Sequence, residues 1–600
     1  MSLTWTTLCL GGYRPETMVV TVWLNAALLV SVLLAGALQK GPAPHPAGWL
    51  LLPFLAYAAA NAAWLTPVGW LGWHDWLLWA QAGAVFWAVL NGVHAAPARN
   101  ALIGLLALLG VVAVGLAVYQ RFFDQEWLML GRLQAPQFIG RSSGPFGIPN
   151  SLGALLLLLL PPALAAGFNR ALAPGRRMFA WTLAAIFALG LILTISRGAW
   201  LALALALAAW PLLAGRRSLG QRLAVSVGVL AALIAAGLAL YQSVPGVRLR
   251  IDQLVADGGE RTRPIMWRIG WSIFREHPAT GGGAGSYNVL LEKFRPENFQ
   301  DDAQWAHNDY LNTLSDYGAV GFGLLFGVIA VLVGRCYWWR RDEKESAGAP
   351  FPSAALGIAL LAFALQLFVD FHFKIPALGM ACALVGALAV RSRWPGAAPA
   401  GNSLRLFSLI AAAAVVGFTA LRAAPHFRAE ALRYDVRRRI DSFALGPGGA
   451  GEERALLAFA LPRVRRAVGI DPVNAQAWAD LAYVLTLTTH IETGRNPALG
   501  AEAEQAARRA LALSPVVAEF WLRLGVALDL QGRWSDAGAA FNEALRLAPN
   551  NATGWFYQGY HFSLRPNFHK LAVAAVATCL RLDPSRRDAE ALRQRLAVTP

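Results

Sequence analysis

Long apolar windows recur along the first 424 residues of the chain and alternate with polar connections. Most of them are long enough for a helix to cross about 30 Å of hydrocarbon, which takes about 20 residues. The windows occupy residues 17–38, 47–65, 75–94, 101–119, 151–167, 179–195, 198–214, 222–241, 318–334, 353–371, 376–390 and 404–424. The pattern predicts an all-α, polytopic membrane protein with about twelve transmembrane helices, because a helix satisfies its own backbone hydrogen bonds in lipid.

Basic residues mark alternate connections between these windows and predict their orientation. They are Lys40, Arg99, Arg170, Arg176, Arg177, Arg216, Arg217, Arg335, Arg340, Arg341, Arg391 and Arg393. The positive-inside rule places these connections in the cytoplasm. The remaining connections, the segment 242–317 and everything after residue 425 then face outward, as do both termini when the number of spans is even. Since 242–317 is the longest polar segment between windows, and long loops are usually functional, we expect the chemistry there.

The C-terminal part has a different, Ala- and Arg-rich helical composition. Residues 1–424 are therefore predicted to form the membrane domain, 425–453 a linker and 454–600 a helical repeat domain. Prolines recur there at about 34 residues, which is the tetratricopeptide period; they are Pro515, Pro549 and Pro584. Other packing positions of one repeat unit are filled by Trp521, Gly525, Ala537, Phe541 and Ala544. We expect an α-solenoid of about three helix pairs, with a concave surface for a protein partner or for assembly.

Composition agrees with a membrane protein, since 56% of the residues are hydrophobic. The formal charge of +17 is compatible with nucleic-acid binding, but the basic residues lie mostly in short connections and in the C-terminal third. This distribution favours membrane topology over a nucleic-acid partner. The four cysteines have no metal-ligand or disulfide spacing, so we expect no metal site.

Ionisable side chains are nearly absent from the interiors of the apolar windows, which argues against an ion-coupled transporter. Arg197 stands in Ser196-Arg197-Gly198, between two windows with no real loop. It is either an interfacial anchor or a cation that binds a lipid phosphate with its bidentate fork. Arg141 precedes another window in a Gly- and Pro-rich segment and allows the same two interpretations. Pro161-Pro162 then predicts a break in the following span.

The long loop contains Arg263 and Arg268, a glycine run at 281–285, and His307. The glycine run lacks the context of a nucleotide-binding loop and is better explained as a turn that lets backbone segments pack closely. Asn308 or Asp309 can cap the next helix. His307 would then lie at a helix N-terminus, which disfavours imidazolium and keeps a neutral base available. A lone histidine is more often structural, but several cations on the same face favour catalysis.

These segments together resemble the O-antigen ligase and O-antigen polymerase superfamily over about residues 140–390. The similar motifs are Phe146-Gly147-Ile148-Pro149-Asn150, Ser196-Arg197-Gly198-Ala199, Arg263 with Trp267, His277-Pro278 leading to Gly283-Ala284-Gly285-Ser286-Tyr287, and His307-Asn308-Asp309-Tyr310-Leu311 with Tyr317-Gly318-Ala319-Val320-Gly321. The glycine run and the outward N-terminus differ from what the family leads us to expect. A tetratricopeptide region lies outside the family core but occurs appended to it.

The resemblance implies a metal-independent, inverting transfer of a glycan from undecaprenyl diphosphate to an acceptor hydroxyl, without a cofactor. It implies a multi-pass protein of the bacterial inner membrane, with the long loop and the repeats in the periplasm. His307 would be the general base, Arg197 and Arg263 would hold the diphosphate, and Arg141 and Arg268 are further candidates for that role. Two or three cations and one base suffice in physical terms, because the diphosphate already activates the anomeric carbon.

Three acceptors remain open: the lipid A core for a ligase of lipopolysaccharide biosynthesis, a growing lipid-linked glycan for a polymerase, and a protein hydroxyl for an oligosaccharyltransferase. From another class, a lipid-glycan flippase or a membrane scaffold remains an alternative. A flippase should carry charged groups along a central path, and a scaffold should tolerate the loss of His307.

Overall fold

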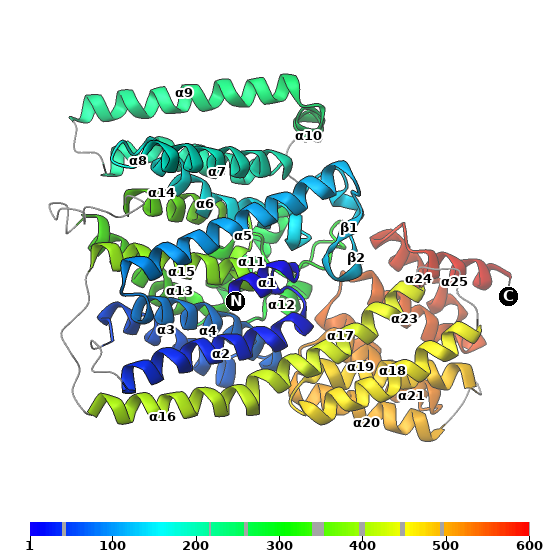
Figure 1. The fold of residues 1–600 in the computed structure, drawn as a ribbon. Helices are drawn as coiled ribbons and strands as arrows, with labels where there is room; N and C mark the ends of the chain where they lie inside the picture. The colour runs from blue at the N-terminus through cyan, green and yellow to red at the C-terminus, as the bar shows by residue number, and fades with distance from the viewer. Residues whose placement is uncertain are drawn as a thin grey trace.

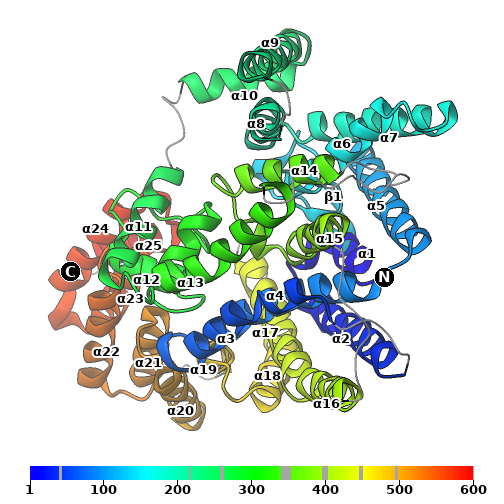
Figure 2. The ribbon, with the colours of Figure 1, turned by 90° about the vertical axis from the view of Figure 1, so that its left-hand side faces the viewer.

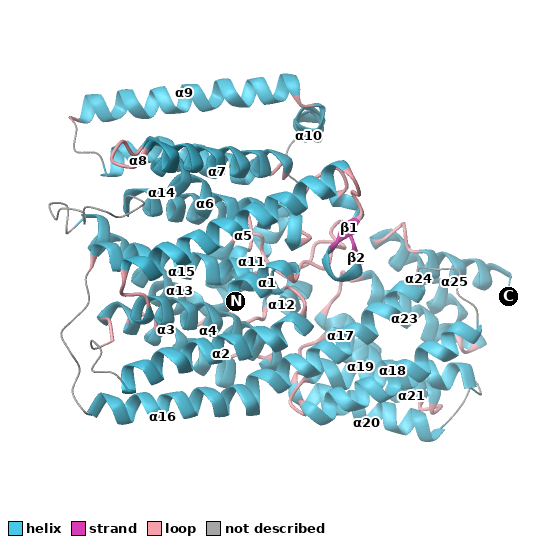
Figure 3. Cartoon of the chain, viewed as in Figure 1, coloured by secondary structure: helices cyan, strands magenta, loops and turns pink. Residues whose placement is uncertain are grey.

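The computed structural model describes residues 1–38, 44–214, 218–256, 262–338, 353–394, 403–444, 450–492 and 497–598. Almost all regular structure in these ranges is helical (Figures 1 and 3). The apolar part contains α1 (Ser2–Leu8), α2 (Pro15–Leu38), α3 (Leu52–Ala60), α4 (Gly69–Gly92), α5 (Ala96–Phe122), α6 (Pro149–Phe168), α7 (Pro174–Leu193), α8 (Arg197–Ala214), α9 (Leu219–Ser243), α13 (Asp309–Val333), α14 (Ser353–Gln366), α15 (Pro376–Arg393) and α16 (Ser403–Phe418). The prediction of an all-α polytopic membrane protein is confirmed.

Eight helices in the described ranges are long and apolar enough to cross a membrane. Two further apolar helices, Arg197–Leu213 and Ser353–Gln366, are shorter. Together with α4 and α15, they account for each of the twelve apolar windows of the sequence.

Helix α6 lies at the centre of the main apolar core and is buried along most of its length. Its neighbours include α5, α7, α8, α14 and α15. Pro161 and Pro162 do not end this helix, which continues from Pro149 to Phe168. The expectation of a break was therefore wrong, and packing on all sides of α6 explains how the helix continues through residues that lack an N–H donor.

Three helices lie in the long polar loop, α10 (Pro245–Ala256), α11 (Thr262–Glu276) and α12 (Tyr287–Phe294). A small antiparallel hairpin joins β1 (Trp127–Leu128) to β2 (Arg132–Leu133), with Trp127 opposite Leu133. Figure 1 shows this hairpin, α10 and the C-terminal helices at the same end of the apolar bundle, and Figure 2 shows α9 and α10 at its edge.

The C-terminal region is a series of helix pairs. Its helices are α17 (Ala424–Ala444), α18 (Ala450–Ile470), α19 (Ala475–Glu492), α20 (Pro497–Leu513), α21 (Ala518–Leu530), α22 (Trp534–Leu547), α23 (Ala552–Ser563), α24 (His569–Leu582) and α25 (Arg587–Val598). Helix α17 falls in the range predicted to be a linker, and residues 445–449 of that range lie outside the described residues. The domain boundaries stay a prediction.

In three successive helix pairs, a tryptophan near the start of the first helix forms a hydrogen bond with the residue six positions before it. Its indole N–H donates to the carbonyl of the preceding proline at 2.8–2.9 Å in each case. The pairs are Trp478 with Pro472, Trp521 with Pro515, and Trp555 with Pro549. The same contact in each unit gives a structural basis for the repeat that the proline spacing predicts.

Candidate functional site

His307 lies between the long loop and α13, in a strained backbone conformation. Its φ is +50°, a left-handed region that residues with a side chain seldom adopt. Asn308 caps α13, as its sequence position predicts, because its side chain accepts a hydrogen bond from the backbone N–H of Leu311 at 3.0 Å. On the other side, the indole N–H of Trp267 in α11 donates to the carbonyl of His307 at 3.4 Å.

The imidazole of His307 faces a buried carboxylate that the sequence did not single out. Its Nδ1 lies 3.6 Å from Oδ1 of Asp370, just beyond hydrogen-bond distance. The Asp370 side chain is 3% exposed and that of His307 is 33% exposed, so the imidazole is paired on one edge and accessible elsewhere. Phe371 meets the imidazole edge to face, with 4.5 Å between the ring centroids.

The neighbours of Asp370 keep it ionised. Burial alone would raise the pKa of this carboxyl, but His372, His307 and Arg263 hold it well below its usual range. The neighbouring His372 is also buried, and this burial lowers its pKa to about 4 although Asp370 opposes the shift. Arg263 therefore lies close enough to act electrostatically on the link between α14 and α15.

Asn150 connects three segments that are far apart in the sequence. Its amide Nδ2 donates to Oδ2 of Asp370 at 2.7 Å. Its Oδ1 accepts from Arg141 Nη2 at 2.8 Å and from Ser196 Oγ at 3.0 Å. Because both ends of the amide are in use, Asn150 cannot rotate without losing these bonds. It thereby fixes Asp370 against the segments that carry Arg141 and Arg197.

Arg197 is the first residue of α8 and follows a tight turn after α7. Ile195 in this turn has a φ of +47°. Arg141 Nε donates to the carbonyl of Thr194 at 3.1 Å and so anchors the turn. The turn also packs on the link that carries Asp370, since a Cβ atom at Gly198 would lie 3.0 Å from Cγ2 of Val369. Arg197 is thus placed beside the same link as His307.

The structure therefore gathers His307 and the segments of Arg141, Arg197 and Arg263 around Asp370. Arg268 differs, because its side chain is exposed and its Nε donates to the carbonyl of Pro264 in its own helix, at 3.4 Å. The catalytic and diphosphate-binding roles of these five residues stay predictions. Within the described ranges, His, Cys, Asp and Glu side chains form no group that could hold a metal ion.

The glycine run forms a close backbone packing with α13, as expected. Gly282 and Gly283 donate to the carbonyls of Ser315 and Asp316 at 2.7 and 3.1 Å. Gly281 and Gly318 have positive φ, and a Cβ atom at Gly318 would lie only 2.3 Å from the carbonyl oxygen of Ala279. Glycine is required here because no side chain fits between the two segments. This contact positions the start of α13, and with it His307.

A buried group of charges lies behind the site. Lys374 contacts Asp75 of α4 at 2.5 Å and Asp316 of α13 at 3.8 Å. Asp75 also accepts from the hydroxyl of Tyr317 at 2.6 Å and from the indole of Trp79 at 3.1 Å. The sequence analysis did not identify this group, although single charges at the edges of apolar windows were a usable signal. It fixes the link 370–374 to two membrane helices.

Comparison with known families supports the resemblance drawn from the motifs. Residues 182–326 match the family described as O-antigen ligase, and residues 500–552 match a tetratricopeptide repeat family. The predicted resemblance, including the C-terminal repeats, is therefore confirmed. The first of these matches supports a membrane enzyme of the O-antigen ligase or polymerase type.

Comparisons with individual proteins add little. The comparison with curated proteins found no match. Among solved structures, the crystal structure of the APC/C hetero-tetramer Cut9-Hcn1 is 12% identical, with 87% of this chain and 76% of that chain covered and a TM-score of 0.23. A score this low carries no argument about the fold.

Proposed function

We propose that this protein transfers a glycan from a polyprenyl diphosphate, undecaprenyl diphosphate in bacteria, to an acceptor hydroxyl at the outer face of the inner membrane. One observation carries the proposal: Asn150 joins the Arg141 and Arg197 segments to Asp370, which faces His307. His307 and the segments that carry these arginines thus converge. An acceptor hydroxyl and a diphosphate leaving group require a base and cations in one place. The family match is the second support.

In the proposed step, the acceptor oxygen attacks the anomeric carbon while the bond from that carbon to the diphosphate oxygen breaks. The bonding electrons leave with the diphosphate, whose growing charge Arg197 and Arg263 stabilise. The acceptor proton passes to Nε2 of His307. This assignment puts the resting proton of the imidazole on Nδ1, the nitrogen that faces Asp370, and Asp370 stabilises the imidazolium that forms. Attack from the side opposite the diphosphate inverts the anomeric centre.

The test is a transfer assay in proteoliposomes, with a defined undecaprenyl diphosphate glycan and glycan, lipid A core or protein acceptors. We expect His307→Ala to lower the rate by about 10²- to 10⁴-fold, the usual contribution of a general base. The matched control is His277→Ala, since His277 is an exposed histidine of the same loop. Transfer by His307→Ala at the wild-type rate would remove the base from the mechanism and favour a scaffold. Export of intact lipid-linked glycan without transfer would favour a flippase.

A further inference from the structure

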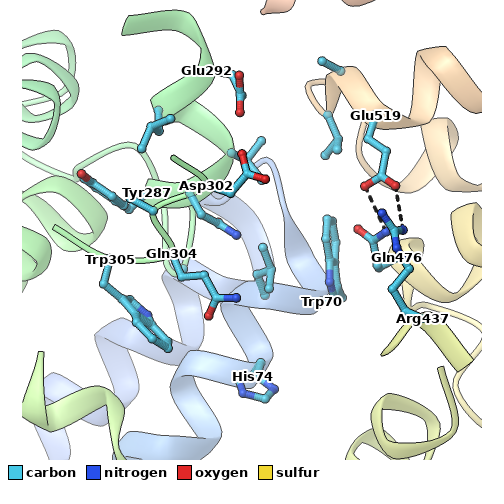
Figure 4. A pocket seen from close by; sticks show the side chains of 18 of the residues that line it. Trp70, His74, Tyr287, Glu292, Asp302, Gln304, Trp305, Arg437, Gln476 and Glu519 are labelled. Atoms are coloured by element: carbon cyan, nitrogen blue, oxygen red, sulfur yellow. Dashed lines mark hydrogen bonds and ion pairs between the residues drawn. The ribbon is translucent and has the colours of Figure 1, made fainter. Parts of the chain in front are cut away.

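A cavity of about 700 Å³ lies between the C-terminal helices on one side and α4 and the long loop on the other. On one side it is lined by Trp70, Tyr287 and Trp305, and on the other by Arg437 and Glu519 among others (Figure 4). The first helices of three successive pairs, α19, α21 and α23, all contribute to this second wall. The volume is typical of a site for a small ligand or a short chain segment, since such pockets measure about 300–1,000 Å³.

The C-terminal helices bind the long loop of the same chain beside this cavity. Asn550 Nδ2 donates to the carbonyl of Arg295 and Asn551 Nδ2 donates to Glu292, at 2.8 and 3.0 Å. Gln300 Nε2 donates to the carbonyl of Asn550 at 2.8 Å. Trp70 of α4 packs on Phe520 of α21, with 5.7 Å between the ring centroids. The repeats therefore already hold a segment of their own chain, and the remaining space suits a slender ligand rather than a folded protein.

One end of the cavity lies near the proposed catalytic base. Trp305, which lines it, stacks on Phe371 with 4.7 Å between the centroids, and Phe371 meets the ring of His307. Only Ala306 separates Trp305 from His307 in the sequence. Lys374, from the link that carries Asp370, also lines the cavity. His307 is not itself one of the residues that line the cavity, so a ligand must extend past Trp305 to present a group to the imidazole.

The chemistry of the lining favours an uncharged ligand with many hydroxyl groups. Seven carboxylates and six Lys or Arg side chains line the cavity, so the charges nearly balance. Many are paired with one another; Glu519, for example, accepts from Arg437 at 3.0 Å and from Arg523 at 2.6 Å. Such a surface offers fixed donors and acceptors without net attraction for an anion such as the diphosphate.

Aromatic side chains complete this surface. Besides Trp70, Tyr287 and Trp305, the lining includes Tyr434, Tyr483 and Tyr557. Rings of this kind pack on the apolar faces of sugars while their polar atoms bind hydroxyls. The indole N–H of Trp70 is buried and has no hydrogen-bond partner within the described ranges. A buried donor without a partner is costly, and a ligand hydroxyl would satisfy it.

We propose that this cavity is the acceptor site and that the acceptor is a carbohydrate chain, which passes between the loop and the repeats and presents a hydroxyl to His307. This inference rests on the proposed function. It assigns the repeats a role as one wall of the site, in place of docking a separate protein on this face.

The experiment narrows the cavity from each side. Asn288→Trp of α12 and Ala518→Trp of α21 change residues that line it. The control is Ala512→Trp, because Ala512 is exposed on α20 and does not line the cavity. Acceptor probes are tagged oligosaccharides released by mild acid from the surface glycan of the source cells. Two rates are measured: transfer to these probes, and release of undecaprenyl diphosphate when water replaces the acceptor.

We expect both filled variants to raise the acceptor KM at least tenfold, while the release to water stays within threefold of the wild type and of Ala512→Trp. Because a bulky residue can disturb folding, Gln476→Ala provides a smaller change at another lining residue and should raise the acceptor KM severalfold. An unchanged acceptor KM in all three variants overturns the inference, as does transfer to polypeptide alone. If the wild type neither transfers nor releases glycan, the proposed function itself fails and the acceptor assignment fails with it.

Discussion

Replacing Asp370 by Asn tests how the proposed base is held and charged. The change keeps the size of the side chain but replaces one oxygen by an amino group. In the wild type both carboxylate oxygens of Asp370 accept hydrogen bonds: Oδ2 accepts from Asn150 at 2.7 Å, and Oδ1 accepts from the backbone N–H of Phe371 at 3.1 Å and also faces His307. Either orientation of the new amide therefore places a donor against a donor. Asn150 cannot relieve this by rotating, because its own oxygen already binds Arg141 and Ser196.

The larger effect concerns the charge of His307 during transfer. At 3.6 Å, an imidazolium and a carboxylate attract each other by about 5 kcal/mol at an effective dielectric constant of about 20. The His307 side chain is about one-third exposed, so solvent reduces this to about 3 kcal/mol. We expect kcat to fall about 10²-fold. The KM for the donor and the KM for the acceptor should each stay within about threefold of the wild-type value, because neither substrate is predicted to contact Asp370 directly.

The assay is steady-state transfer in proteoliposomes, with purified variants checked for monodispersity and thermal unfolding. Asp301→Asn is the matched control, since Asp301 is an exposed aspartate of the loop that carries His307. The double variant with His307→Ala is the decisive measurement, because residues that act as a unit give non-additive losses. If Asp370→Asn slows the His307→Ala enzyme by a further 10²-fold, Asp370 does not act through His307. A wild-type kcat in the single variant Asp370→Asn would equally refute the reasoning.

Three further predictions concern the surroundings of the base. Arg197→Lys should lower transfer at least tenfold at saturating donor, because an ammonium group cannot reproduce the bidentate fork; an unchanged rate would assign Arg197 to interfacial anchoring. Gly318→Ala should lower the free energy of unfolding by at least about 2 kcal/mol, because φ at this position is +64° and the new Cβ atom meets a backbone oxygen. The control is Gly323→Ala on the same helix, where the new Cβ atom lies in open space and should not destabilise the protein. Burial lowers the pKa of His372 from 6.5 to about 4 in the folded protein, so as the pH falls between these values the unfolded chain takes up a proton at this residue before the folded protein does, and the free energy of unfolding decreases by up to about 3 kcal/mol. His372→Phe should therefore flatten the decline in melting temperature between pH 6.5 and 4.5. An identical decline in the variant and the wild type would exclude His372 as the cause.

The helices could be predicted from the sequence because their signal is local. An apolar run of sufficient length forms a helix in lipid whatever its neighbours are, and each predicted window coincides with a helix. The capping role of Asn308 was likewise readable, since it depends on the next three residues. Pro161 and Pro162 misled the prediction because the local rule takes no account of the packing that surrounds α6.

The site was only partly predictable. His307, Arg141, Arg197 and Arg263 stand out as polar groups in distinctive motifs, so the sequence identified them. Asp370 did not stand out, and Asn150 was noted only as the last residue of a motif, without a role. Their hydrogen bond joins residues 220 positions apart. A contact of this kind arises from how α6 and the α14–α15 link meet in space, and no single-sequence periodicity records it. Lys374 was missed for the same reason, since its partners Asp75 and Asp316 lie on two other helices.

These contacts explain how an irregular link can hold Asp370 firmly. Residues 370–374 form no long helix, yet the link is fixed at both ends: Asp370 binds Asn150 at the start of α6, and Lys374 binds Asp75 of α4. Backbone bonds add to this, since the N–H of Asp309 donates to the carbonyls of Leu367 and Asp370. Because α4, α6 and α13 are packed helices, their relative positions set the distance between His307 and Asp370. The apolar bundle thus determines the geometry of a polar site that lies outside its apolar core, and this is how a loop can carry chemistry that needs placement within about 0.5 Å.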